Sequence, residues 1–145
     1  MPQSSETLVR RLIDEGFNDG NLDVADELIA PDCVEHQNFG PNHAAGPEGV
    51  KAVIASLRRA FSDFHLTIDD LAVDGRGTVW LRMTGSGTND GSFMGNPPTG
   101  RTMRIDVFDA LRVETGQIVE HWGVPDRLGS LFQLGLAHPA GPSTP

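Results

Sequence analysis

The chain has 145 residues and a formal net charge of −9 at pH 7, from 20 acidic and 11 basic side chains. This length predicts a single domain, and a content of 38% hydrophobic and 21% charged residues is typical of a globular protein. An acidic protein repels phosphate backbones and anionic lipid headgroups. Neither a nucleic acid nor a membrane surface is therefore expected as a partner.

Cysteine content and the N-terminal residues indicate the compartment. The one cysteine, Cys33, excludes an internal disulfide framework and a thiolate metal cluster. Residues 1–6 are polar, so no signal peptide is expected. The apolar runs are far shorter than the ~20 residues that cross a bilayer. These features predict a cytoplasmic protein.

Helical spacing of apolar residues dominates the first part of the chain. It predicts helices over residues 5–17, 22–29 and 47–61, with Pro31 ending the second and Pro47 in the first turn of the third. A short extended segment is expected at residues 33–37, followed by a loop.

After residue 62 the hydrophobic period changes from 3.6 to 2. Alternation predicts strands around residues 64–69, 79–84, 103–108 and 118–124, with hairpin turns at 74–77 and 114–116 and a closing helix at 128–136. Three helices followed by antiparallel strands predict an α+β fold, with helices covering a curved sheet and a pocket between the layers. We expect one domain over residues 1–136 and a flexible tail over 137–145.

Asp109 is the first candidate for chemistry. It continues the alternation of Met103, Ile105 and Val107, so its carboxylate is expected within an apolar row of one sheet face. In general, desolvation raises the pKa of a carboxyl group, which makes it a general acid or base near neutral pH. The alternatives are a strand bulge that turns Asp109 outward, or a structural hydrogen bond to the backbone.

His121 is the second candidate. Alternation places it on one face of its strand with Gly123, and Glu120 and Trp122 on the other. Counting outward from the turn at 114–116 places Asp109 near the level of His121 or Trp122, which predicts a cross-strand contact between Asp109 and His121. A carboxylate orients an imidazole and raises its basicity. The alternative is a histidine that only packs.

Three further residues are candidates for binding a substrate. His36 is expected at the mouth of the pocket, and Asp126 could contact a ligand or simply cap the closing helix. Trp122 could line the substrate site or belong to a core or a subunit interface. The sequence lacks a Walker loop, a complete dinucleotide loop and a helical zinc pair, so no cofactor and no metal site are predicted.

Several segments together resemble a known family. They are Phe17-Asn18-Asp19-Gly20-Asn21-Leu22, Glu35-His36, Gly46-Pro47-Glu48-Gly49-Val50-Lys51, Gly95-Asn96-Pro97-Pro98-Thr99-Gly100-Arg101 and Gly116-Gln117-Ile118-Val119-Glu120-His121-Trp122. This ordered set, over roughly residues 8–136, resembles the SnoaL-like polyketide cyclases, or ester cyclases, of the NTF2-like superfamily. The resemblance implies a cone-shaped α+β fold around a hydrophobic cavity, and a homodimer or higher assembly built through the outer sheet face.

The resemblance also implies a chemistry without metal or cofactor. A carboxylate removes a proton next to a carbonyl, and the enolate attacks an aldehyde or ketone. In the ester-cyclase branch the catalytic aspartate lies two residues after the histidine of the last strand, where this chain has Gly123, and a histidine lies where this chain has Asp109. The resemblance therefore leaves a rearranged pair, with Asp109 as the base and His121 as its partner.

The expected function is cofactor-independent cyclisation or isomerisation of a small hydrophobic carbonyl compound. Two alternatives remain. The protein could bind a small molecule without catalysis, which Gly123 favours, or it could be a related hydroxylase or epoxide hydrolase. An epoxide hydrolase would need a second aspartate and an arginine beside Asp109.

Overall fold

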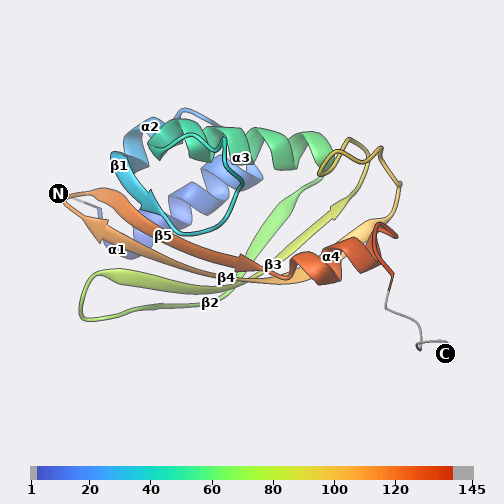
Figure 1. Ribbon diagram of the computed structural model, residues 1–145. Helices are drawn as coiled ribbons and strands as arrows, with labels where there is room; N and C mark the ends of the chain where they lie inside the picture. Colours follow the sequence, from blue (N-terminus) through green and yellow to red (C-terminus); the bar gives the residue numbers. More distant parts are fainter. Residues whose placement is uncertain (1–2, 139–145) are drawn as a thin grey trace, which may run out of the picture.

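The structure is a computed structural model that describes residues 3–138, and it confirms the predicted α+β class (Figure 1). The helices are α1 (Ser5–Arg11), η1 (Leu12–Asn18), α2 (Val24–Leu28), α3 (Gly46–Ala60) and α4 (Arg127–Gln133). Each lies where the sequence predicts a helix, although α4 ends three residues earlier than expected. Almost all of the expected tail at 137–145 lies outside the described residues.

Local capping explains where the first helix begins. The Ser4 hydroxyl accepts a hydrogen bond from the Thr7 amide at 3.1 Å and so caps α1. α1 continues into η1, which is wound more widely, because the Asp19 amide bonds the Asp14 carbonyl five residues earlier. The predicted single helix over 5–17 is thus one continuous helix with an α-helical first half and a π-helical second half.

Five strands form one sheet in the order β1-β5-β4-β3-β2. Their bounds are β1 Ile29–Glu35, β2 His65–Val73, β3 Thr78–Thr88, β4 Thr102–Glu114 and β5 Gln117–Pro125. The neighbouring strands from β2 through β5 pair antiparallel, as predicted. β1, in contrast, pairs parallel with β5. The short extended segment expected at residues 33–37 overlaps this longer strand, which adds a parallel edge to the antiparallel sheet. Pro31 ends no helix but lies within β1, where its fixed φ suits an extended edge strand.

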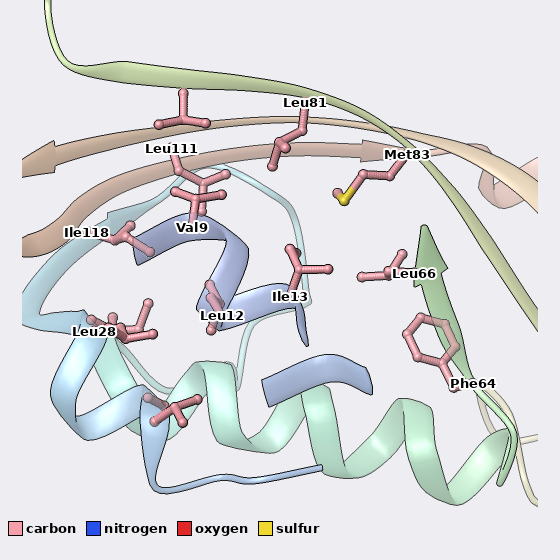
Figure 2. Close-up of a cluster of buried hydrophobic side chains, with 14 of the residues drawn as sticks. Val9, Leu12, Ile13, Leu28, Phe64, Leu66, Leu81, Met83, Leu111 and Ile118 are labelled. Atoms are coloured by element: carbon pink, nitrogen blue, oxygen red, sulfur yellow. The ribbon is translucent and has the colours of Figure 1, made fainter. Parts of the chain in front are cut away.

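The core fills the space between the helices and the sheet. In Figure 1, α1, α2 and α3 lie on one side of the curved sheet. Figure 2 shows side chains from both layers meeting there: Val9, Leu12, Ile13, Leu28, Leu81, Met83, Leu111 and Ile118. Full burial of such a side chain contributes about 1.5–3 kcal/mol, so this cluster stabilises the packing of the helices on the sheet. The hydrophobic cavity expected between the layers stays a prediction.

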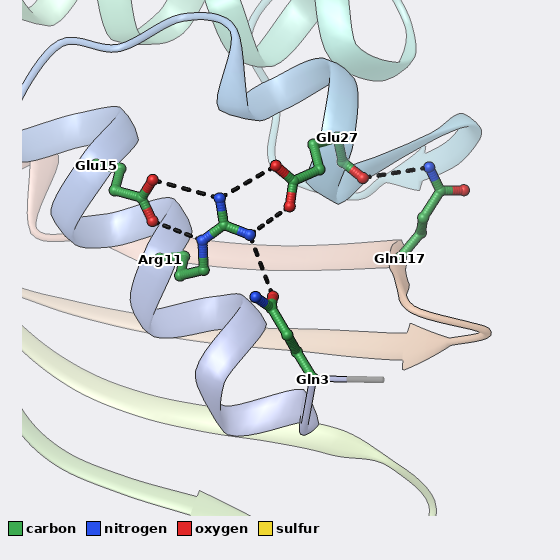
Figure 3. Close-up of polar contacts among 5 residues, drawn as sticks. All are labelled: Gln3, Arg11, Glu15, Glu27 and Gln117. Atoms are coloured by element: carbon green, nitrogen blue, oxygen red, sulfur yellow. Dashed lines mark hydrogen bonds and ion pairs between the residues drawn. The ribbon is translucent and has the colours of Figure 1, made fainter. Parts of the chain in front are cut away.

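Arg11 connects the helices to one another. Its guanidinium contacts Gln3, Glu15 and Glu27, with 2.6 Å between Arg11 Nε and Glu15 Oε2 (Figure 3). The Gln117 amide donates to the Glu27 carbonyl at 3.4 Å, which joins α2 to the start of β5. Among the described residues, no helix is long and apolar enough to span a membrane.

Candidate active site

Three side chains from three neighbouring strands meet on the face of the sheet that carries the core. His121 lies between two carboxylates, with its Nε2 3.0 Å from Asp109 Oδ2 and its Nδ1 2.6 Å from Glu35 Oε2. Glu35 is the direct partner of His121 across the parallel β1–β5 pair. The side chains of Asp109, His121 and Glu35 are only 14%, 16% and 20% exposed. The predicted Asp109–His121 contact is thus present, within a nearly buried trio.

The contact is diagonal. The direct cross-strand partner of Asp109 is Gly123, and that of His121 is Leu111. The register shifts between Arg112 and Val113. Counting from the turn placed Asp109 at the level of His121 or Trp122, one or two residues short of its observed partner Gly123. Diagonal neighbours on one face are close enough for long side chains to touch.

The two carboxylates determine the charge of the imidazole. Burial by itself disfavours the imidazolium, but the hydrogen bonds and charges of Asp109 and Glu35 outweigh it and raise the pKa of His121 to about 9. At pH 7 both ring nitrogens therefore carry protons, and each donates to a carboxylate. His121 is then a fixed cation and donor, and the free lone pairs of the site belong to the carboxylates.

The second oxygen of Asp109 has a different environment. Asp109 Oδ1 is buried and has no hydrogen-bond partner among the described residues. It faces the backbone of Gly123, where an added Cβ would lie 3.0 Å from it and 2.1 Å from Gln37 Oε1. The Gln37 amide thus occupies the room that the missing side chain at position 123 leaves.

Glu35 and Gln37 were missed by the sequence analysis. Their position depends on the pairing of β1 with β5, which are separated by more than half of the chain and joined by no hairpin. Glu35 Oε2 also accepts the Gln37 amide proton at 3.1 Å, so one carboxylate anchors both His121 and the chain segment that carries Gln37. The available signal was period 2, since Glu35 lies on the face opposite to its neighbour His36.

His36 and Trp122 lie on the other face of the sheet. Their rings stack with centroids 4.7 Å apart and planes 5° apart, and His36 Nε2 lies 2.7 Å from Glu120 Oε2. The expectation that His36 points toward the space between the layers was wrong, because its side chain lies on the outer face and β1 presents Glu35 to the core face instead. Trp122 likewise points away from Asp109 and is 38% exposed on the outer face.

Asp126 adopts the simpler of its two predicted roles. Its Oδ1 accepts a hydrogen bond from the Gly129 amide at 2.8 Å, so its carboxylate caps α4.

No group of three or more His, Cys, Asp or Glu side chains in the described part of the chain is arranged to hold a metal ion. The trio of Glu35, His121 and Asp109 instead pairs each imidazole nitrogen with a carboxylate, an arrangement that holds the ring and the two carboxylates in fixed orientations.

Comparisons with known proteins point to one family. The sequence model described as SnoaL-like polyketide cyclase matches residues 7–134. The aklanonic acid methyl ester cyclase DnrD of Streptomyces peucetius is 32% identical, over 91% of this chain and 91% of its own length. The nogalonic acid methyl ester cyclase of Streptomyces nogalater is 29% identical, over 82% and 89%.

Solved structures show the same fold. TsrD from Streptomyces laurentii superimposes with a TM-score of 0.81 at 30% identity, covering 91% of this chain and 95% of its own. IdmH from Streptomyces antibioticus gives a TM-score of 0.77 at 34% identity, covering 92% and 99%. Similarity of sequence and of structure therefore agree over nearly the whole chain.

Proposed function

Because the chain belongs to the SnoaL-like polyketide cyclase family, we propose that it cyclises or isomerises a hydrophobic polyketide carbonyl compound, with Asp109 as the base. The observation that carries the proposal is the asymmetric environment of the Asp109 carboxylate. Oδ2 accepts a hydrogen bond from the His121 imidazolium, whereas Oδ1 has no partner among the described residues. A buried carboxylate oxygen with free lone pairs suits proton abstraction.

The reaction follows from these roles. Asp109 Oδ1 takes the proton of a carbon next to a carbonyl, and the electron pair of the broken C–H bond moves onto the carbonyl oxygen to give an enolate. The enolate carbon then forms a bond to a second carbonyl carbon of the same molecule, and the proton on Asp109 passes to the new alkoxide. Atoms balance without a co-reactant, and the product is an isomer of the substrate.

His121 and Glu35 support this cycle from behind the base. The imidazolium hydrogen bond holds Asp109 in one rotamer and stabilises its negative charge before proton transfer. Glu35 fixes the orientation of the imidazole by accepting from Nδ1. We assign Asp109 as the group that touches the substrate, and His121 and Glu35 as positioning residues.

The proposal is tested with the substrates named for the relatives. Purified protein is incubated with aklanonic acid methyl ester and, separately, nogalonic acid methyl ester, and products are followed by chromatography with mass detection. We expect conversion of one of them to a product of unchanged mass and altered retention. Saturable binding of both esters without any conversion would overturn the enzyme proposal in favour of a binding protein.

We also propose that the outer sheet face forms a homodimer. Phe108 and Val124 are 55% and 70% exposed there, beside Trp80 and Trp122. These residues border a hollow of about 420 Å³ on the described surface. An exposed cluster of large apolar side chains is typical of an interaction site, and in a two-fold dimer the same patch on each copy can pack against the other.

A further inference from the structure

The side chain of Gln37 lies beside the base of the proposed reaction. Gln37 Oε1 is 2.1 Å from the point where a Cβ at position 123 would lie, and Asp109 Oδ1 is 3.0 Å from that same point. The backbone amide of Gln37 is held at 3.1 Å by Glu35 Oε2, the oxygen that also bonds His121. The half-buried Gln37 side chain and the free oxygen of Asp109 therefore both lie against Gly123, and the backbone that carries Gln37 is held in place.

A buried carboxylate oxygen without a donor is costly, because it has given up its hydrogen bonds to water and gained none in return. A glutamine amide carries a donor and an acceptor on one carbon, so half a turn about its last torsion exchanges Oε1 for Nε2. That rotation brings an N–H group to the position beside Asp109 Oδ1. The amide then satisfies the one buried side-chain oxygen that has no partner among the described residues.

We propose that Gln37 is a movable hydrogen-bond donor, which bonds Asp109 Oδ1 in the free protein and the carbonyl oxygen of the substrate as the proton is removed. The second half of this inference rests on the proposed function. It adds to that function the group that stabilises the enolate.

The reason is the path of the negative charge. Before the reaction the charge lies on Asp109. Once Oδ1 has taken the proton, Asp109 is neutral and the charge lies on the enolate oxygen of the substrate. His121 cannot follow the charge, because both of its nitrogens are committed to carboxylates. A neutral amide on a flexible side chain next to Oδ1 can donate to either oxygen.

Gly123 makes this movement possible. Any side chain at position 123 would begin at the place that the Gln37 amide occupies, 2.9 Å from His121 Cε1. The absence of a side chain there is therefore part of the site. The pair of Gln37 and Gly123 functions as one unit, in which the glycine provides the space and the glutamine the donor.

The contact in the free protein is tested without any substrate. The side-chain amide resonances of Gln37 and Gln117 are compared by NMR between the wild type and Asp109→Asn. We expect the Gln37 resonances to move and those of Gln117, whose amide contacts the distant Glu27 carbonyl, to stay. Unchanged Gln37 resonances would overturn the contact, whether or not the protein converts an ester.

The role in the reaction is tested with Gln37→Leu, which keeps the size of the side chain and removes the donor. With aklanonic acid methyl ester we expect kcat to fall on the order of 100-fold, the effect of removing one oxyanion donor, with little change in KM. Gln117→Leu is the matched control and should keep wild-type kcat. An unchanged kcat in Gln37→Leu would overturn the donor role. Failure of the wild type to convert either ester would instead contradict the proposed function. In that case the NMR comparison still decides whether Gln37 contacts Asp109 in the free protein.

Discussion

Asp109 and Gly123 are direct partners across β4 and β5, so the carboxylate of Asp109 faces a backbone with no side chain. His121 reaches Asp109 diagonally on the same sheet face, and Gln37 enters the remaining space from the segment after β1. Gly123, which has no side chain of its own, thus lies at the centre of the site.

Gly123→Ala is expected to lower the free energy of unfolding by about 1 kcal/mol, because the new Cβ crowds His121 and Asp109 and must displace the Gln37 amide. Denaturant unfolding measures this. The matched control is Gly75→Ala in the β2–β3 turn, where an added Cβ meets nothing within 4 Å. Equal stability of the two variants would contradict the close packing at position 123.

His121 should make stability depend on pH. Its pKa of about 9 in the folded protein lies above the value of 6.5 for an unperturbed histidine, so the folded state binds the proton more tightly. This contribution is complete below about pH 6.5 and is lost as the pH rises through 9. The loss amounts to a few kcal/mol at most. An NMR titration midpoint of His121 near 6.5 would refute it.

Glu35→Gln should lower the pKa of His121 from about 9 toward its ordinary value, because one of the two negative charges beside the ring is removed while an acceptor oxygen stays. An NMR titration of His121 checks this. Glu48→Gln, at an exposed position of α3, is the control and should leave the midpoint where it was. The same midpoint in Glu35→Gln as in the wild type would show that Glu35 does not govern the imidazole.

Val124→Glu should break the proposed homodimer, because it places a charge at the most exposed large apolar residue of the outer sheet face. Light scattering during size exclusion measures the mass, and circular dichroism checks that the fold persists. The control is Leu128→Glu on α4, which is expected to remain dimeric. Leu128 is 59% exposed, comparable with the 70% of Val124, but it does not lie on the sheet. A monomeric wild type would contradict the interface.

The order of the elements could be predicted because it depends on local patterns. Helical spacing in residues 47–61 and alternation in residues 103–108 each need only a few neighbouring residues, and hairpin turns join β2 to β3 and β4 to β5. Asp109 and His121 came from such alternation. Their contact followed from a hairpin count that was wrong only in register, because of the shift between Arg112 and Val113.

The remainder of the site depends on pairing between distant segments. β1 lies parallel to β5 without a connecting turn, so local patterns could not place Glu35 beside His121 or Gln37 beside Gly123. The choice of His36 rather than Glu35 has the same origin. In a short edge strand the sequence does not reveal which of two neighbouring polar residues faces the core.

The role of Asp109 as the base is tested by comparing kcat of Asp109→Asn and Asp106→Asn with the ester that the wild type converts. Asp106 lies three residues earlier on β4 and is exposed on the outer face. Asp106→Asn makes the same chemical change away from the site and is therefore the matched control. We predict a loss in Asp109→Asn of at least about 100-fold, the lower range for removal of a general base, and wild-type kcat in Asp106→Asn. Wild-type turnover by Asp109→Asn would show that another group removes the proton.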